Sequence, residues 1–339
     1  MTPDTQETSM TRISDTLHCA VSRRTVLGAL ASTLPLVGYA DTYPSRSVKV
    51  IVTNAPGSLT DVVARQVLGP MQKITGQSFV VDNVVGAGGI VGTESVVRAA
   101  PDGYTLGMVP STHAMLPALY KLSYDPVKSI TPISIVGSSA LILCVSPKIT
   151  SKTPQEFFAL SKSRAEGVTI GSPGVGTAIH IASEMMAAQT GMKWLHVPYK
   201  ANSGLTTDLL GGQVDAAFLG GASAMPLVKS GKLRAIAVSG HNRLGPLPDV
   251  PTLSESGLPG FNIDAWVAVI GPANLPSAVV TRLHQDLQKA LAEKSVQDYL
   301  RDQSVEVINT TPAQALDIFT KDIAKYAKVV KDGNIKGAS

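Results

Sequence analysis

The sequence ISIVGSSALILCV, residues 133–145, is an apolar and β-branched segment near the middle of this 339-residue chain. Residues of this kind favour β-strands. Strands in globular proteins are usually about 5 or 6 residues long, so this segment is too long for one ordinary strand. We therefore expect it to cross from one domain into another, and the chain is long enough for two domains of common size.

On the N-terminal side of this segment, strand and helix patterns alternate. The first helix is expected to begin near Ser58, which has capping-box spacing with Asp61, and to end at Gly76. A second helix is expected at Ile90–Arg98. The alternation predicts α/β layers with largely parallel sheets. Three strands are expected, at Val48–Thr53, Phe79–Val84 and Tyr104–Val109.

On the C-terminal side a second alternating series follows. Pro246–Gly260 is rich in Pro and Gly and predicts an extended loop. Phe261–Ile270 then resembles a second crossing, and two amphipathic helices, about 276–293 and 312–331, are expected in the tail. The series itself is expected to contain helices at 154–164, 177–190, 203–211 and 223–230, and strands at Val168–Ile170, Trp194–Val197, Val214–Leu219 and Arg234–Val238.

The two crossings predict a chain that leaves domain I, builds domain II and returns. We expect domain I to comprise residues 41–140 and 264–339, and domain II to comprise residues 141–263. Two crossings form a hinge with a central cleft between the domains, and such a cleft can close on a ligand.

The N-terminus resembles a signal peptide for export. Arg23 and Arg24 precede the apolar run Val26–Val37, and Gly38-Tyr39-Ala40 supplies the small residues of a cleavage site. The run is too short to span a bilayer core of about 30 Å as a helix. The paired arginines favour a twin-arginine signal for residues 1–40, and an ordinary secretory signal is the alternative. Either signal predicts a periplasmic protein.

Cysteine content and charge limit the possible functions. Removing the signal would leave Cys144 as the one remaining cysteine, so no intrachain disulfide is expected, and its apolar surroundings favour a buried position. Aromatic residues make up only 5% of the chain, and its Lys and Arg are scattered at a formal net charge of +4. This pattern argues against nucleic acid as a partner and suits anionic solutes.

Two loops have the composition of anion-binding turns. Asn54–Asp61 and Gly171–Thr177 each follow an expected strand, are rich in small and hydroxyl residues, and open an expected helix. Backbone N–H groups and the helix dipole favour a negative charge at such a position. Ligands also collect at the carboxyl ends of strands in open α/β sheets. The alternative is that both loops are tight turns with ordinary N-caps.

Motifs for catalysis, nucleotides and metals are not found. Gly86–Gly92 departs from the dinucleotide pattern G-x-G-x-x-G because Val91 stands at its last glycine. No G-x-S-x-G, H-E-x-x-H or Walker loop occurs, and no two histidines after residue 40 are four apart. We therefore expect no enzyme, no cofactor and no metal site. His180, one turn into the helix after the second loop, is either a packing or capping residue or part of a site.

At this point several motifs together resemble one family. They are Tyr43-Pro44-Ser45-Arg46, Gly86-Ala87-Gly88-Gly89, Pro101-Asp102-Gly103-Tyr104, Leu122-Ser123-Tyr124-Asp125-Pro126, Gly171-Ser172-Pro173-Gly174-Val175-Gly176-Thr177, His196-Val197-Pro198-Tyr199, Asp208-Leu209-Leu210-Gly211-Gly212, Gly231-Lys232-Leu233-Arg234 and Leu247-Pro248-Asp249-Val250-Pro251-Thr252. In this order they resemble the Bug-type substrate-binding proteins of the tripartite tricarboxylate transporter family, nearly end to end.

The resemblance implies a two-domain α/β periplasmic binding protein, type II-like, which captures a small carboxylated molecule and delivers it to a membrane permease of the tripartite tricarboxylate type. A monomer is expected. A sensory protein that presents ligand to a signalling receptor is one alternative, and an exported enzyme is another. By position, the resemblance implies that ligand is bound by Pro56, Gly57, Ser58, Thr60, Asp61, Ser111, Thr112, Ser172, Gly174, Gly176, Thr177, Phe218 and Ser223, with Trp266 also near it.

Two departures from the family pattern bear on the ligand. Asn54 and Leu59 interrupt a first loop that is usually richer in Pro and Gly, and Leu219 follows Phe218 where the family often has an acidic residue. Without that carboxylate, a plain carboxylic or aromatic acid is a better expectation than an amino acid.

Overall fold

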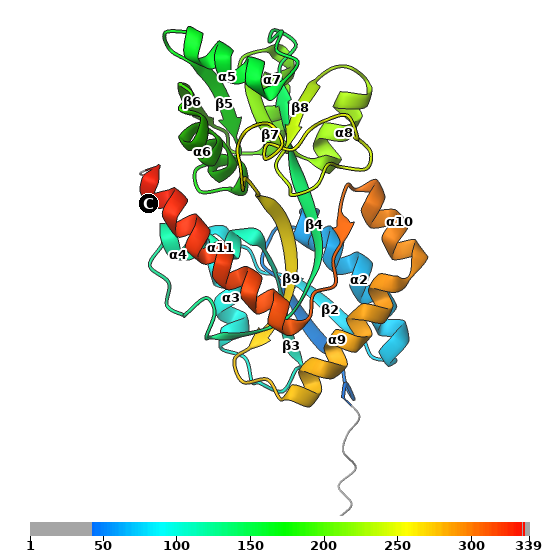
Figure 1. Ribbon diagram of the computed structural model, residues 1–339. Helices are drawn as coiled ribbons and strands as arrows, with labels where there is room; N and C mark the ends of the chain where they lie inside the picture. The colour runs from blue at the N-terminus through cyan, green and yellow to red at the C-terminus, as the bar shows by residue number, and fades with distance from the viewer. Residues whose placement is uncertain (1–42, 334, 336–339) are drawn as a thin grey trace, which may run out of the picture. The chain divides into compact units, whose positions relative to one another are not determined.

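The structure is a computed structural model that describes residues 43–333 and 335. The predicted signal peptide, residues 1–40, lies outside the described residues. Ten strands form one mixed sheet in the order β2-β1-β3-β9-β4-β7-β5-β6, and β8 and β10 pair with β4 as well. Helices flank the strands (Figure 1). We call residues 43–140 and 264–333 lobe I, and residues 141–263 lobe II.

Lobe I begins with three parallel strands, β1 (Val48–Val52), β2 (Phe79–Asn83) and β3 (Thr105–Pro110). In β1, Val50 lies opposite Val81 of β2 and Leu106 of β3. Helix α2 (Leu59–Thr75) follows β1 and packs on α9 (Ser277–Ala292), while α3 (Ile90–Val97) contacts β1 and β3. The buried valines of β1 and α2 share one core with leucines of α9, so this lobe is held by apolar burial.

Lobe II repeats the alternation of strand and helix. Strands β7, β5 and β6 are parallel neighbours, with β5 in the middle. The elements are α5 (Pro154–Ser163), β5 (Val168–Ser172), α6 (Ala178–Thr190), β6 (Trp194–Pro198), α7 (Asn202–Gly211), β7 (Ala216–Gly220), α8 (Gly221–Lys229) and β8 (Arg234–Val238).

Strand β4 (Ile130–Val145) connects the lobes and is 16 residues long. From Ile130 to Ala140 it pairs antiparallel with β9 (Asp264–Pro272), and from Leu141 onwards it pairs with β7 and β8. The exchange of partners therefore falls between Ala140 and Leu141. We keep 41–140 with 264–339 and 141–263 as proposed domains on this ground, although the chain from Tyr43 onwards packs as one compact unit.

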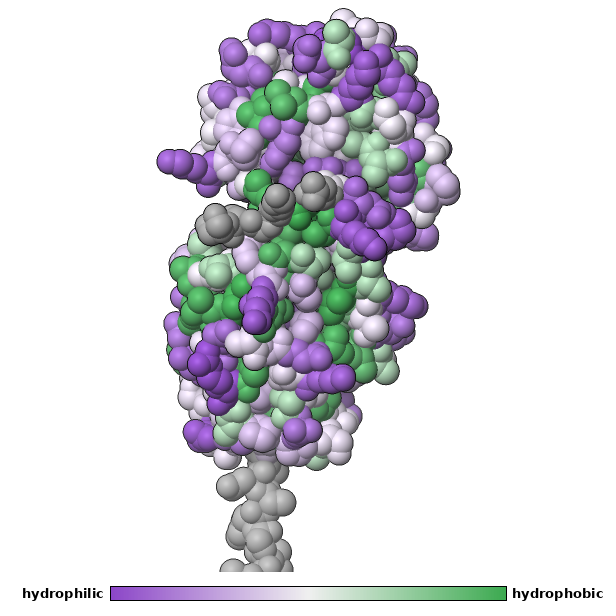
Figure 2. Space-filling view, turned by 90° about the vertical axis from the view of Figure 1, so that its left-hand side faces the viewer, coloured by the Kyte–Doolittle hydropathy of each residue, from purple (hydrophilic) through white to green (hydrophobic). Residues whose placement is uncertain are grey.

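Helix α11 (Pro312–Asp332) contacts elements of both lobes, namely α4 (Leu116–Leu119) in lobe I and α6 in lobe II. Figure 2 views the molecule from the left-hand side of Figure 1 and shows hydrophobic and hydrophilic residues interspersed over that face. Within the part of the chain that the structure describes, no helix has both the length and the apolar character needed to cross a membrane.

The tail differs from the sequence prediction, which had two helices. A third helix, α10 (Lys294–Asp302), follows α9 directly, and a two-residue strand, β10 (Glu306–Val307), then pairs with β4. Only Val296 and Leu300 of α10 are buried. Helix α10 is amphipathic, but it has only nine residues and Glu293 alone separates it from α9, so the sequence does not show it as a separate helix.

Candidate functional site

The first candidate loop lies at the carboxyl ends of the lobe I strands. The Asn83 side-chain amide, at the end of β2, donates to the Asn54 carbonyl oxygen after β1 at 3.0 Å. A Cβ atom at Gly89 would lie 3.3 Å from the Thr53 hydroxyl oxygen. The loop after β1 and the turn after β2 are therefore neighbours at one edge of the sheet, as expected for parallel strands.

Side chains of the first loop hold the loop itself in shape. Asp61 accepts from the Gly57 N–H at 2.9 Å and from the Asn83 amide at 3.0 Å, and it pairs with Arg65 at 3.0 Å. Burial opposes ionisation of Asp61, but the hydrogen bonds from Arg65, Gly57 and Asn83 outweigh it and lower the pKa of its carboxyl. Ser58 is the N-cap of α2 and accepts from the Asp61 N–H. The buried carboxylate thus fixes the turn that leads into α2.

The other predicted residues of lobe I lie at the same edge of the sheet. Thr60 is buried and its hydroxyl donates to the Asn54 side-chain oxygen at 3.3 Å. Pro56 is exposed at the tip of the loop. Ser111 and Thr112 open the short 3₁₀ helix η2 (Ser111–Ala114) at the end of β3, with Ser111 buried and Thr112 partly exposed. These residues surround the carboxyl ends of β1 and β3.

The second candidate loop, Ser172–Thr177, joins β5 to α6. Thr177 is the N-cap of α6: its hydroxyl accepts from the His180 N–H at 3.3 Å and donates to the Gly174 carbonyl at 2.8 Å. The Ser172 hydroxyl accepts from the Gly174 N–H at 3.2 Å. Gly174 and Gly176 have φ angles of +131° and +77°, which suit glycine and disfavour other residues. This loop is also shaped by its own side chains.

Two stacked histidines lie beneath the second loop. The rings of His180 and His196 have centroids 4.0 Å apart and planes 18° apart. His180 Nδ1 accepts from the Gly176 N–H at 3.1 Å, and His196 Nε2 lies 2.6 Å from the Ser172 hydroxyl. The sequence pattern left His180 open and did not single out His196. His196 lies in the middle of β6, opposite Ile170 of β5, and its side chain reaches Ser172 at the start of the loop.

Helix α4 lies next to both glycine-rich turns. A Cβ atom at Gly176 in lobe II would meet Leu119 at 2.8 Å, and one at Gly88 in lobe I would meet Leu116 at 3.3 Å. Leu116 and Leu119 were not predicted as site residues. They show that the second loop approaches the strand-end region of lobe I through α4.

Comparison with known proteins identifies the family of this chain. A model of the tripartite tricarboxylate transporter family receptor matches residues 63–335. The chain belongs to this receptor family. The predicted resemblance is therefore confirmed, and the family is one of solute-binding receptors.

Three solved structures share the receptor's fold. The periplasmic binding protein BugD is 31% identical, with 87% of this chain and 100% of that chain covered and a TM-score of 0.74. Rpa4515 of R. palustris, with adipate, is 27% identical over 87% of this chain and 100% of that chain, with a TM-score of 0.76. MatC from Rhodopseudomonas palustris, with bound malate, is 29% identical over 85% and 100%, with a TM-score of 0.73. The predicted two-domain α/β binding-protein fold is confirmed.

Two aromatic residues expected near the ligand are packed in the receptor's interior. The Phe218 side chain is fully buried in the core, so we remove it from the proposed site. Trp266 is 4% exposed, stacks on Phe319 at 4.8 Å and donates to Asp322 at 2.8 Å. Ser223, in the first turn of α8, is exposed.

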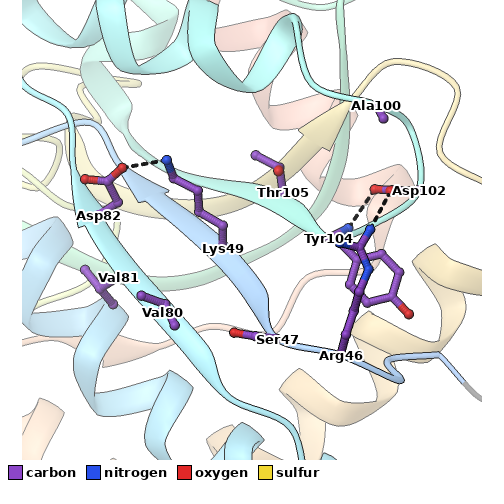
Figure 3. A pocket seen from close by; sticks show the side chains of 10 residues that line it. All are labelled: Arg46, Ser47, Lys49, Val80, Val81, Asp82, Ala100, Asp102, Tyr104 and Thr105. Carbon is purple, nitrogen blue, oxygen red and sulfur yellow. Dashed lines mark hydrogen bonds and ion pairs between the residues drawn. The ribbon is translucent and has the colours of Figure 1, made fainter.

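A cavity of about 600 Å³ in the receptor lies away from both loops, near the amino ends of β1 and β3 (Figure 3). Its charged side chains pair with one another: Lys49 with Asp82 at 2.7 Å and Arg46 with Asp102 at 3.1 Å. Arg46 also lies over the Tyr104 ring. Because each charge is already matched, we assign this cavity no ligand.

Proposed function

We propose that this receptor is periplasmic, that it captures a small carboxylated molecule between the first loop (54–61) and the second loop (172–177), and that it delivers this molecule to a membrane permease of the tripartite tricarboxylate type. It binds without catalysis. Apart from Phe218, the residues predicted for the site remain its proposed ligand contacts. Their two clusters provide one anion-binding turn in each lobe.

The observation that carries this proposal is the matched start of α2 and α6. Each helix follows the carboxyl end of a parallel strand through a glycine-containing loop, and each has a hydroxyl N-cap, Ser58 and Thr177, that accepts from the third residue of the helix. The caps leave the N–H groups of the first two helical residues without intrahelical partners. These are Leu59 and Thr60 in α2, and Ala178 and Ile179 in α6. Such groups, aided by the helix dipole, bind carboxylates.

Relatives support the class of ligand. The two related structures above hold adipate and malate, which are both dicarboxylates. In this chain Leu219, Gly220 and Gly221 follow Phe218, so no acidic side chain is available there to pair with an amino group. We therefore propose a plain organic acid rather than an amino acid.

Thermal shift with matched ligands tests the proposal. The purified protein is titrated with adipate and malate, and with adipamide, which has the adipate skeleton but no charge. A bound acid at 100 times its Kd should add about 2.7 kcal/mol to the free energy of unfolding. That corresponds to an increase in Tm of about 5 °C. Adipamide should have no effect. Equal stabilisation by adipate and adipamide would refute a carboxylate site.

Transport is tested separately. Membrane vesicles that contain the permease should accumulate labelled acid only when the loaded receptor is added, and the acid should be recovered chemically unchanged. Accumulation without the receptor would refute delivery, and conversion of the acid would refute binding without catalysis.

A further inference from the structure

The stacked pair His180 and His196 is not used by the function proposed above. His180 is 4% exposed and lies in the first turn of α6, and His196 lies on the adjacent β6. Trp194 packs beside both rings, at 6.5 and 5.9 Å between centroids. A buried imidazole stacked on a half-buried one, each hydrogen-bonded to the second loop, indicates a role beyond filling the core.

Hydrogen bonding fixes the proton on His180. Its Nδ1 accepts from the Gly176 N–H at 3.1 Å and so carries no proton. The neutral ring therefore has its proton on Nε2, which faces Glu184 Oε1 at 3.3 Å. A second proton can only be added at Nδ1. There it would face the Gly176 N–H, and the bond between ring and loop would be lost.

We propose that His180 is a positioning residue that holds the second loop in its ligand-binding shape only while its ring is neutral, so that carboxylate capture weakens in acid. The inference rests on the function proposed above, because it concerns the same loop. Gly176 is the last residue before the N-cap Thr177, so a loosened Gly176 displaces the start of α6, where the carboxylate would bind.

The groups around His180 support this assignment. On its own helix the facing charge is Glu184, and from β6 it is His196. Helix α11 approaches Glu184 through Gly333, and α4 presents Leu119 to Gly176. Burial, and then the charge of His180, lower the pKa of His196 to about 4, while Glu184 opposes this. His196 therefore stays neutral at the pH where an ordinary histidine titrates, about 6.5, and cannot be the source of a response there.

The direction of the pH effect separates this mechanism from simple electrostatics. A positive imidazolium near an anion site would by itself raise the affinity for a carboxylate as the pH falls. Loss of the Gly176 hydrogen bond predicts the opposite, because the site loses its shape. The sign of the dependence is therefore decisive.

Three variants isolate the role of His180. His180→Asn retains an acceptor oxygen near the position of Nδ1 but cannot be protonated. His180→Leu removes the acceptor. His241→Asn removes an exposed histidine in another loop of lobe II and serves as a matched control. Protonation of the ligand itself affects every variant equally.

The first measurement needs no ligand. In ¹⁵N NMR spectra of the purified wild-type protein, the Gly176 amide should shift together with the His180 ring nitrogens as the pH is lowered from neutral, because protonation of Nδ1 breaks their hydrogen bond. In His180→Asn the Gly176 amide should not titrate. A Gly176 amide that stays constant while His180 takes up its proton would overturn the proposal, whatever the protein binds.

The second measurement uses adipate in calorimetric titrations over the same pH range. Wild type and His241→Asn should lose affinity by about tenfold towards acid, as expected for one hydrogen bond. His180→Asn should lose only the affinity that protonation of adipate itself removes. His180→Leu should bind adipate weakly at every pH. Higher affinity in acid, or equal pH profiles for wild type and His180→Asn, would refute the positioning role of His180. If neither adipate nor malate binds, the proposed ligand class fails, and the NMR result still tests the positioning role of His180.

Discussion

Replacing Thr177 with valine tests whether the second loop is held by the hydroxyl that the structure identifies. Valine has nearly the same volume as threonine but has no hydroxyl. The change removes the hydrogen bond to the Gly174 carbonyl at 2.8 Å and the bond from the His180 N–H at 3.3 Å. Thr177→Ser keeps both bonds and is the matched control.

The expected magnitude follows from these two bonds. Loss of an N-cap costs about 1 kcal/mol, and loss of a second hydrogen bond costs about 1 kcal/mol more. For a protein of this size 1 kcal/mol changes Tm by about 2 °C, so Thr177→Val should lower Tm by about 4 °C. The freed Gly174 carbonyl also loosens the loop, and we expect the affinity for adipate to fall by about tenfold.

Melting curves and calorimetric titrations of the two variants distinguish the possible outcomes. Thr177→Ser should resemble wild type in both measurements. If Thr177→Val has the same Tm as Thr177→Ser, the hydroxyl does not hold the loop and the reasoning fails. If Tm falls while the affinity for adipate is unchanged, Thr177 is only an N-cap and the loop is not part of the site.

Three further predictions concern other parts of the molecule. Gly92→Ala should destabilise the protein by about 1–3 kcal/mol in denaturant melts, because its Cβ would lie 2.7 Å from a backbone oxygen, whereas Gly69→Ala, with nothing within 4 Å, should be neutral or stabilising. Burial raises the pKa of Asp264 to about 6, so the folded state loses stability as pH rises from about 4 to 6, and Asp264→Asn should flatten this slope in melts across that range. Arg23→Lys with Arg24→Lys should leave the precursor in the cytoplasm in cell fractionation. Normal export of that double variant would exclude the twin-arginine pathway.

The fold was largely predictable because its strongest signals are local. The β-branched run that forms β4 stood out from the sequence, and its length alone suggested two sets of partners. Strand pairing from Ile130 to Ala140 and again from Leu141 shows such a division. By contrast, β10 has two residues and exists only because β4 offers it an edge, so no sequence pattern could predict it.

The site was predictable in position but not in its internal contacts. Glycine and hydroxyl residues after a strand indicated both loops. Asn83 and His196, which hold those loops, come from neighbouring strands. His196 belongs to a family motif, but the sequence did not indicate the contact of either residue with its loop. The contact of Phe218 is hard to predict for a related reason: β7 is buried on both faces for most of its length, so its alternation does not tell which side chain faces a cleft.

The side chains of both loops are used mainly within the loops. Asp61 binds Gly57 and Asn83, Thr177 binds Gly174, and His180 binds Gly176. A carboxylate held there would therefore meet backbone N–H groups at the starts of two helices. Such N–H groups can bind any carboxylate of suitable size, because they contact only the anionic end of the ligand. Selectivity among organic acids must then come from the side chains that surround the rest of the ligand. Substitutions inside the loops should weaken all acids alike, whereas exchanges at partly exposed positions such as Thr112 should change which acid is preferred.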